Sequence, residues 1–108
     1  MSAPFVTELR ARPEIIRLGA PGAAAINLRI EMPEVWDVVR MVAAVDVPVL
    51  AVKTRALEAL FPEAVRHEDF VLKLRGWEIL DESASITGAG AIDGSILLLT
   101  HRRRRAVR

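Results

Sequence analysis

The clearest signal in the chain is an alternation of apolar and polar residues in two distant segments, residues 25–31 and residues 70–75. Side chains alternate between the two faces of a strand, so each segment predicts a β-strand with one apolar face. The residues of these apolar faces are Ile26, Leu28 and Ile30 in the first segment, and Leu72 and Leu74 in the second. Each apolar face needs a cover from elsewhere in the chain.

Residues 37–45 allow two interpretations. They are rich in β-branched valine, which favours a strand that returns beside residues 25–31 after a turn at residues 32–36. Pro33, however, suits the first position of a helix, and the valines after it fall at helical spacing. These valines are Val35, Val38, Val39 and Val42. We favour the strand and keep the helix as the alternative.

A helix is predicted over residues 49–61, between Pro48 and Pro62, because proline suits a helix start and stops a helix that reaches it. Its apolar stripe consists of Val49, Val52, Ala56, Leu57 and Leu60. The side chains that we expect to face water are Lys53, Thr54, Arg55 and Glu58. The stripe is the best candidate to cover Leu72 and Leu74.

The C-terminal half predicts a short strand, a loop and a final strand. The apolar residues of the short strand are Trp77, Ile79 and Leu80. The loop covers residues 81–90, and we expect its Ile86 to enter the core. Asp93-Gly94 is a strong turn dipeptide. Residues 96–99 are apolar throughout, which predicts a central strand buried on both faces.

The domain organisation follows from these elements. Residues 1–23 contain repeated proline and glycine and form an N-terminal extension, either loose or laid as an extra edge strand through residues 15–18. Residues 24–101 form one domain, and residues 102–108 form a basic C-terminal tail.

These elements predict an α+β fold, in which one main helix packs across a mixed sheet of four to five strands. Their order resembles the ubiquitin-like β-grasp fold over residues 25–105. The segments that carry the resemblance are Val49-x-x-Val52-Lys53, then Leu72-Lys73-Leu74-Arg75-Gly76 with Leu80-Asp81, and finally Gly90 to Leu99. A fold of this kind hosts many functions, so function has to be argued from particular residues.

Ubiquitin itself is conjugated through a C-terminal Gly-Gly, and this chain departs from that pattern. At the positions where the resemblance places the two glycines it has Arg105 and Ala106, and Gly-Gly occurs nowhere in the sequence. An activating enzyme needs a flexible end without side chains. We therefore expect a protein that is not conjugated, and the same absence argues against the related sulfur carriers.

A second departure concerns the apolar patch that ubiquitin presents on its sheet. The resemblance places Lys73 at the centre of this patch and Thr100 at a further position. A receptor that grips ubiquitin there would have to desolvate a cation, so we expect it to reject this chain. Ile96 and Leu98 either replace the patch beside Lys73 or are covered by the N-terminal segment.

Composition restricts the function further. With 108 residues, of which 52% are hydrophobic, the chain holds one well-packed core. It has no cysteine, no apolar run of membrane-spanning length and no apolar leader, so we expect a cytoplasmic protein without disulfides or a transmembrane segment. Its two histidines do not fall at a ligand spacing and its serines have no histidine at a plausible place, so we expect no enzyme activity, metal or cofactor.

The net charge of +1 conceals a division along the chain. Residues 1–101 carry ten basic and fourteen acidic side chains, whereas the last seven residues carry five arginines. A run of like charges of this kind is usually a solvated segment without a binding role. The alternative is an anionic-surface or nucleic-acid binder, although the acidic body and the lack of interleaved aromatic residues weaken it.

The remaining function is a protein-interaction module, an adaptor or accessory subunit whose partner the sequence does not identify. The alanine- and arginine-rich composition looks bacterial, and the chain is similar to type VII secretion accessory proteins and to small subunits of multicomponent oxygenases. Trp36 and Trp77 lie near turns, where we favour closure of the core over exposed binding anchors. The candidate partner-binding residues are Trp36, Lys73, Trp77, Ile96, Leu98, Thr100, Arg102, Arg103, Arg104 and Arg105.

Overall fold

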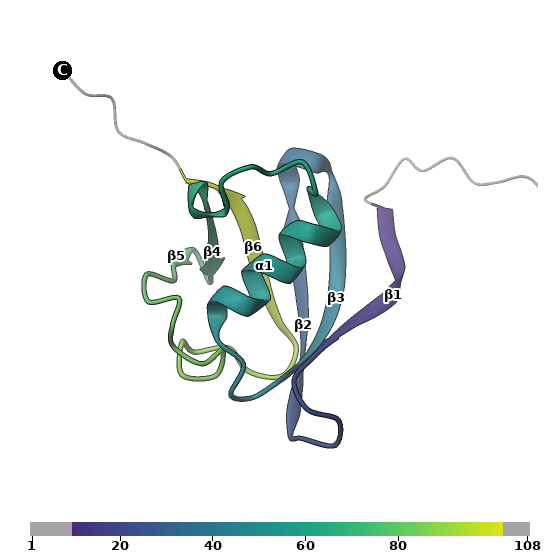
Figure 1. Ribbon diagram of the computed structural model, residues 1–108, viewed down its shortest axis with the longest axis vertical. Helices are drawn as coiled ribbons and strands as arrows, with labels where there is room; N and C mark the ends of the chain where they lie inside the picture. Colours follow the sequence, from purple (N-terminus) through teal and green to yellow (C-terminus); the bar gives the residue numbers. More distant parts are fainter. Residues whose placement is uncertain (1–9, 103–108) are drawn as a thin grey trace, which may run out of the picture.

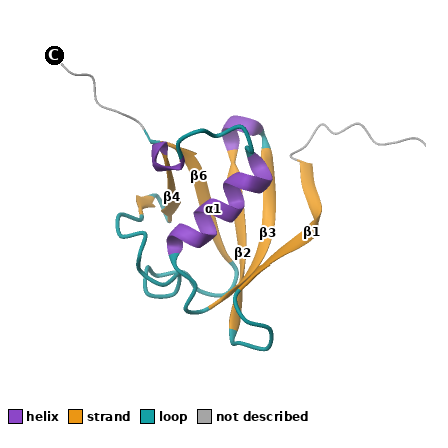
Figure 2. Ribbon diagram, in the orientation of Figure 1, coloured by secondary structure: helices purple, strands orange, loops and turns teal. Residues whose placement is uncertain are grey.

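The computed structural model describes residues 10–102, and the side chains of residues 14–102. The strands are β1 (Arg10–Leu18), β2 (Ala25–Met32), β3 (Asp37–Ala44), β4 (Phe70–Leu74), β5 (Trp77–Glu78) and β6 (Ser95–His101). The helices are α1 (Val49–Leu60) and the short 3-10 helices η1 (Pro33–Val35) and η2 (His67–Asp69). Figures 1 and 2 show α1 lying diagonally across one face of a single sheet.

The sheet has six strands in the order β1-β3-β2-β6-β4-β5. The pairs β2–β3, β4–β6 and β4–β5 are antiparallel, whereas β1–β3 and β2–β6 are parallel. The predicted mixed sheet beneath one helix is therefore confirmed, with one strand more than expected. Residues 37–44 form the returning strand, so the helical alternative for them is wrong.

The core lies between α1 and the face of the sheet that it covers, which we call the inner face. All five residues of the predicted helical stripe are buried, and Leu72 and Leu74 are buried with them. Ile86 closes the core from the loop after β5, as predicted, and is fully buried. The opposite face of the sheet, which we call the outer face, has no covering helix among the described residues.

The N-terminal segment takes the edge-strand form, and β1 extends the sheet beyond β3. Its Ile16 and Leu18 pack against the core from the inner face. Gly19 then turns the chain at a φ of +105°, and a Cβ there would lie 2.4 Å from the Cβ of Ala44, so only glycine fits. In the described chain, β3 and β2 lie between β1 and β6, so β1 extends the sheet at its edge and does not cover the outer face.

Two predictions for the C-terminal half are wrong, the extent of the short strand and the burial of the last one. The short strand ends at Glu78, and Leu80 lies outside it with 81% of its side chain exposed, because the chain turns away to form the loop beneath α1. Strand β6 is central but buried on one face only. Leu97 and Leu99 enter the core, whereas Ile96 on the outer face is 54% exposed, because no second layer among residues 10–102 covers it.

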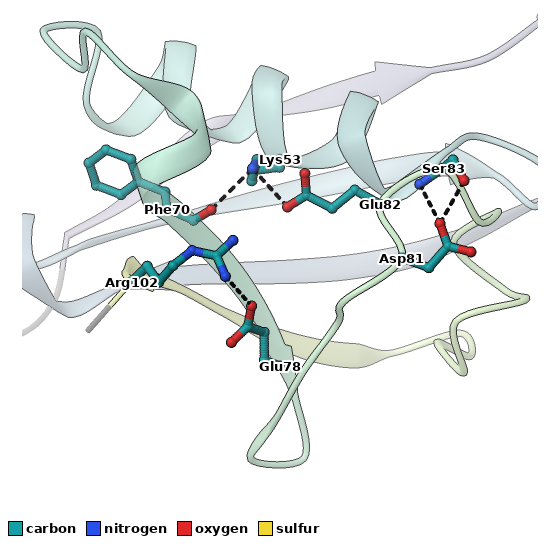
Figure 3. Close-up of polar contacts among 7 residues, drawn as sticks. All are labelled: Lys53, Phe70, Glu78, Asp81, Glu82, Ser83 and Arg102. Carbon is teal, nitrogen blue, oxygen red and sulfur yellow. Dashed lines mark hydrogen bonds and ion pairs between the residues drawn. The ribbon is translucent and has the colours of Figure 1, made fainter. Parts of the chain in front are cut away.

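A third correction concerns Lys53, which was expected to face water and is 99% removed from it. Its Nζ lies 2.7 Å from Glu82 Oε2 and donates a hydrogen bond of 3.1 Å to the carbonyl of Phe70 (Figure 3). The lysine stem packs in the apolar layer while its ammonium reaches partners at the rim. Lys53 thus joins α1 to the start of β4 and to the loop after β5.

The loop after β5 also satisfies the start of the helix. No side chain caps α1, but the backbone N–H groups of Val49 and Leu50 donate to the carbonyls of Ala84 and Glu82. Asp81 accepts hydrogen bonds from the Ser83 hydroxyl and N–H, and these bonds lower the pKa of its carboxyl. The loop is therefore a fixed part of the fold.

Two carboxylates hold the ends of β6. Before it, Asp93 accepts hydrogen bonds from the backbone N–H and side-chain amide of Asn27, which lower its pKa. After it, Glu34 of η1 accepts bonds from the Thr100 hydroxyl at 2.5 Å and the His101 N–H at 2.9 Å. Partial burial raises the pKa of Glu34, but these hydrogen bonds outweigh it, so its pKa lies below the ordinary 4.5.

We predict that Glu82→Ala lowers the free energy of unfolding by about 1–3 kcal/mol, because it leaves a buried ammonium with one acceptor. The matched control is Glu58→Ala, which breaks an exposed pair with Arg55 and should change it by less than about 0.5 kcal/mol. Lys53→Met should cost less than Glu82→Ala, since no buried charge is then left unpaired. Urea unfolding measures all three, and equal costs for the two glutamate variants would contradict the assigned role of Lys53.

We predict that Glu34→Gln makes stability less sensitive to acid. Because the folded-state pKa of Glu34 is lowered, its contribution is complete above its unfolded pKa and is lost as the pH falls through the folded value. The free energy of unfolding of Glu34→Gln should therefore fall less between about pH 5 and pH 3 than that of the parent. The control is Glu63→Gln, whose carboxylate makes no hydrogen bond or ion pair with the described residues. Identical pH profiles for both variants would show that the bonds to Thr100 and His101 contribute nothing.

Candidate functional site

Within residues 10–102 no helix covers the outer face of the sheet, and strand register fixes which side chains share this face. Residues paired directly across two strands point to the same face. The side chains on the outer face are Ile15 and Arg17 of β1; Val38, Arg40 and Val42 of β3; Asn27, Arg29 and Glu31 of β2; Ile96, Leu98 and Thr100 of β6; Val71 and Lys73 of β4; and Glu78 of β5.

A hollow of about 560 Å³ opens on this face between β4 and the C-terminal end of β6. It is lined by Glu34, Val71, Lys73, Glu78, Thr100, His101 and Arg102, and we call it the Lys73 hollow. Lys73 pairs across the strands with Leu98, and Val71 pairs with Thr100. The structure therefore brings together four of the predicted partner-binding residues, namely Lys73, Leu98, Thr100 and Arg102.

Some of the charged side chains in the Lys73 hollow have hydrogen-bond or ion-pair partners, and one does not. Glu34 is engaged by Thr100 and His101, and Glu78 Oε2 lies 2.8 Å from Nη1 of Arg102 (Figure 3). Lys73 makes no hydrogen bond or ion pair with the described residues, although it is paired across the strands with Glu78. A half-buried ammonium without a partner is what the hollow offers to an approaching carboxylate.

Ile96 supplies the apolar part of the same face. It is 54% exposed, it lies beside Arg29 of β2, and the partly buried Leu98 follows it on the outer face of β6. The described part of the N-terminal segment leaves both uncovered. The outer face therefore presents apolar and charged side chains side by side, a combination that suits a protein partner.

The expectation that Trp36 and Trp77 close the core is wrong, because their side chains are 66% and 79% exposed. The core is closed instead by Phe70, which packs edge-on against Phe61 at 5.9 Å. Trp36 lies at the β2–β3 connection, with a left-handed φ of 58°, and Trp77 lies in the edge strand β5, which β6 and β4 separate from β2. The two rings therefore do not form one patch.

The geometry adds one residue that the sequence did not indicate and leaves others untested. Glu34 enters the site because η1 folds it against the end of β6, yet it is 66 positions from Thr100, and no local pattern marks such a contact. Arg103, Arg104 and Arg105 lie outside the described residues. Within the described chain, no group of three or more acidic or histidine side chains is placed to hold a metal ion.

The helices of residues 10–102 are also too short or too polar to cross a membrane.

Comparison with known proteins gave matches to solved structures only. No protein-family model matches the chain, and no curated protein matches it.

The matching structures are ubiquitin-like domains. A ubiquitin of Caldiarchaeum subterraneum matches with a TM-score of 0.62 at 17% identity, over 77% of this chain and 100% of its own. The ubiquitin-like domain of an Arabidopsis thaliana protein matches with 0.62 at 13% identity, over 82% and 90%. The C-terminal ubiquitin-like domain of mouse tubulin-specific chaperone e matches with 0.62 at 15% identity, over 82% and 97%.

Identities this low show likeness of structure and nothing about partners or chemistry. Together with the strand order and the single helix across the sheet, they confirm the fold that the sequence predicts. This chain therefore has the ubiquitin-like β-grasp fold, with an added N-terminal edge strand.

Proposed function

We propose that this chain is a non-enzymatic protein-interaction module, an adaptor or accessory subunit that binds its partner through the outer face of the sheet. The observation that carries the proposal is the exposed Ile96 and, two residues on, Leu98 paired with the unpaired cation of Lys73, on a face that no helix covers within residues 10–102. An apolar side chain beside charges provides both burial energy and specificity to a protein partner.

The chemistry of this surface supports a selective binder. A partner that buries Lys73 has to supply a carboxylate, because an unpaired ammonium is costly to desolvate. Receptors built for an apolar patch at this position would leave Lys73 unsatisfied and bind poorly. The surface therefore favours partners of its own over those of ubiquitin.

We also propose that the chain is not a conjugated modifier. Arg105 and Ala106 occupy the positions at which the resemblance to ubiquitin places the two glycines. The side chain of an arginine does not fit the narrow channel through which an activating enzyme reaches a glycine carboxylate. A bacterial cytoplasmic setting belongs to the same proposal and is supported by the cysteine-free, alanine- and arginine-rich composition.

A binding role without catalysis is supported by the side chains of the site. Among the described residues, no serine or threonine hydroxyl is hydrogen-bonded to a histidine, so no activated nucleophile is present there. His101 packs edge-on against Phe70 with ring centroids 4.9 Å apart, and Glu34 is held by two hydrogen bonds. These groups are engaged in maintaining the end of β6.

Photo-crosslinking tests the proposal. The photoreactive amino acid p-benzoylphenylalanine is placed at Ile96 on the outer face and, as the matched control, at Leu50, which is 48% exposed on α1. In cells that express the tagged full chain, we expect light-dependent adducts with a defined protein from position 96 and none from position 50. Lys73→Glu should reduce the yield at position 96 at least about tenfold, because it reverses the charge beside the contact.

The same experiment separates the alternatives. Equal adducts from both positions would contradict binding through the outer face. Adducts that form without light would contradict the absence of conjugation. Adducts with nucleic acid in place of protein would favour the anionic binder, and an oxygenase component at position 96 would specify the accessory-subunit form.

A further inference from the structure

Three arginines from three neighbouring strands meet on the outer face, away from the Lys73 hollow. Arg29 of β2 lies directly opposite Arg40 of β3. Arg40 is also in register with Ile15 of β1, and Arg17 follows two positions later on the same face. We call Arg17, Arg40 and Arg29 the arginine row. No local pattern reveals this row, because its members are brought together only by the register of β1, β3 and β2.

The fold gains nothing from this arrangement. Like charges directly opposite each other across two strands are destabilising. One described carboxylate engages the row, that of Glu31, whose Oε2 lies 2.9 Å from Nε of Arg29. Arg17 and Arg40 make no ion pair or hydrogen bond through their side chains with the described residues. Two of the three cations in the row are therefore uncompensated within the described residues, which points to a ligand that supplies the missing negative charge.

The surroundings of the row specify the ligand further. Ile96 lies directly beside Arg29 on the neighbouring strand, and Ile15, which is 41% exposed, lies beside Arg40. The cations are therefore flanked by exposed aliphatic side chains on both sides. A ligand that satisfies all of them carries negative groups next to an apolar group.

We propose that the arginine row and Ile96 bind an acidic segment of a partner protein, one in which carboxylates flank an apolar side chain. This inference rests on the proposed protein-binding role of the outer face and names the chemistry of the partner. The guanidinium groups pair with the carboxylates of the segment, and its apolar side chain packs on Ile96.

A peptide fits this face better than a nucleic acid does. Glu31, Glu34 and Glu78 share the outer face or its rim and would repel a continuous phosphate backbone. Binding of single strands also relies on aromatic side chains that stack on bases. Trp77 lies in β5, at the edge of the sheet opposite β1, and Trp36 lies in the β2–β3 connection, so neither shares the strand register of the row.

The N-terminal strand is part of this site. Arg17 and Ile15 come from β1, which the fold places next to β3. This strand lies before residues 25–105, the part of the sequence that resembles ubiquitin. Without β1 the sheet would lack Arg17 and Ile15, so the site is incomplete without this strand.

NMR titration of the isotope-labelled full chain tests the proposal. The probe is a synthetic peptide of glutamates around two leucines, titrated at about 50 and about 200 mM salt. We expect the largest shift changes at Arg17, Arg29, Arg40 and Ile96, with binding at least about tenfold weaker at the higher salt. The double variant Arg29→Gln/Arg40→Gln should weaken binding at least about tenfold without lowering the free energy of unfolding, because it also removes a like-charge pair.

Four controls make the result specific. Arg55→Gln removes an arginine of similar exposure from α1 and should leave binding unchanged. Ile96→Ser, and a peptide with serine in place of leucine, should each weaken binding by about fivefold or more. An oligothymidylate should bind more weakly than the peptide.

The outcomes that overturn the inference differ from those that overturn the proposed function. Shift changes confined to the Lys73 hollow would refute the arginine row and leave the outer face as the binding surface. Equal loss from Arg55→Gln would show attraction by net charge alone. Tighter binding of the oligothymidylate, or no binding of the peptide at either salt concentration, would also refute the acidic partner.

Discussion

The ion pair of Lys53 with Glu82 is the contact on which the arrangement of the two layers depends. The ammonium is buried beneath α1 and bonded both to Glu82 and to the carbonyl of Phe70, so one side chain fixes the helix relative to β4 and to the loop after β5. That loop in turn satisfies the first backbone N–H groups of α1 and carries Ile86 into the core. A buried charge tolerates few alternative positions, because every shift of the helix leaves it unpaired. The contact therefore selects one crossing of helix and sheet among those that apolar packing alone would allow.

Within residues 10–102, α1 covers only one face of the six-stranded sheet. The residues at the other face divide by whether they stabilise the fold. Glu34 and Asp93 hold the two ends of β6, and the pair of Glu78 with Arg102 ties β5 to the end of that strand. The carboxylates of Glu34 and Asp93 are satisfied by these hydrogen bonds, and the charge of Glu78 is compensated by Arg102. Lys73, Arg40 and Arg17 have no such compensation within the described chain, and Ile96 gains nothing from exposure to water. The fold does not need these residues, but it holds them on a rigid face. Selection for binding can therefore act on them without loss of structure.

Local pattern was sufficient for the elements and for the core, and insufficient for contacts between distant residues. The alternation in β2 and β4 and the stripe of α1 report burial by one neighbouring layer, so they predicted which side chains enter the core. The same reasoning failed for Lys53, because helical periodicity places a lysine toward water and cannot foresee that Glu82 and Phe70 will meet it. It failed for Ile96 because an apolar run indicates burial on both faces only when a second layer exists. Trp36 and Trp77 were misassigned for a related reason, since the core that they were expected to close is already filled by Phe61, Phe70 and Ile86.

The added strand β1 changes what the outer face can do. A six-stranded sheet exposes a wider face than the strands that resemble ubiquitin would alone, and its new edge brings Arg17 and Ile15 alongside Arg40. Gly19 fixes the path into β2 through a close contact with Ala44 that no other residue allows, so the strand is built into the fold at both its turn and its inner face. If β1 served only to cover the edge of β3, uncharged side chains or charges of alternating sign on its outer face would serve equally well. They would also avoid the electrostatic repulsion between arginines. The like charges that it adds are better explained by a ligand that the sheet acquires together with the strand, because only an external anion turns their mutual repulsion into a favourable interaction.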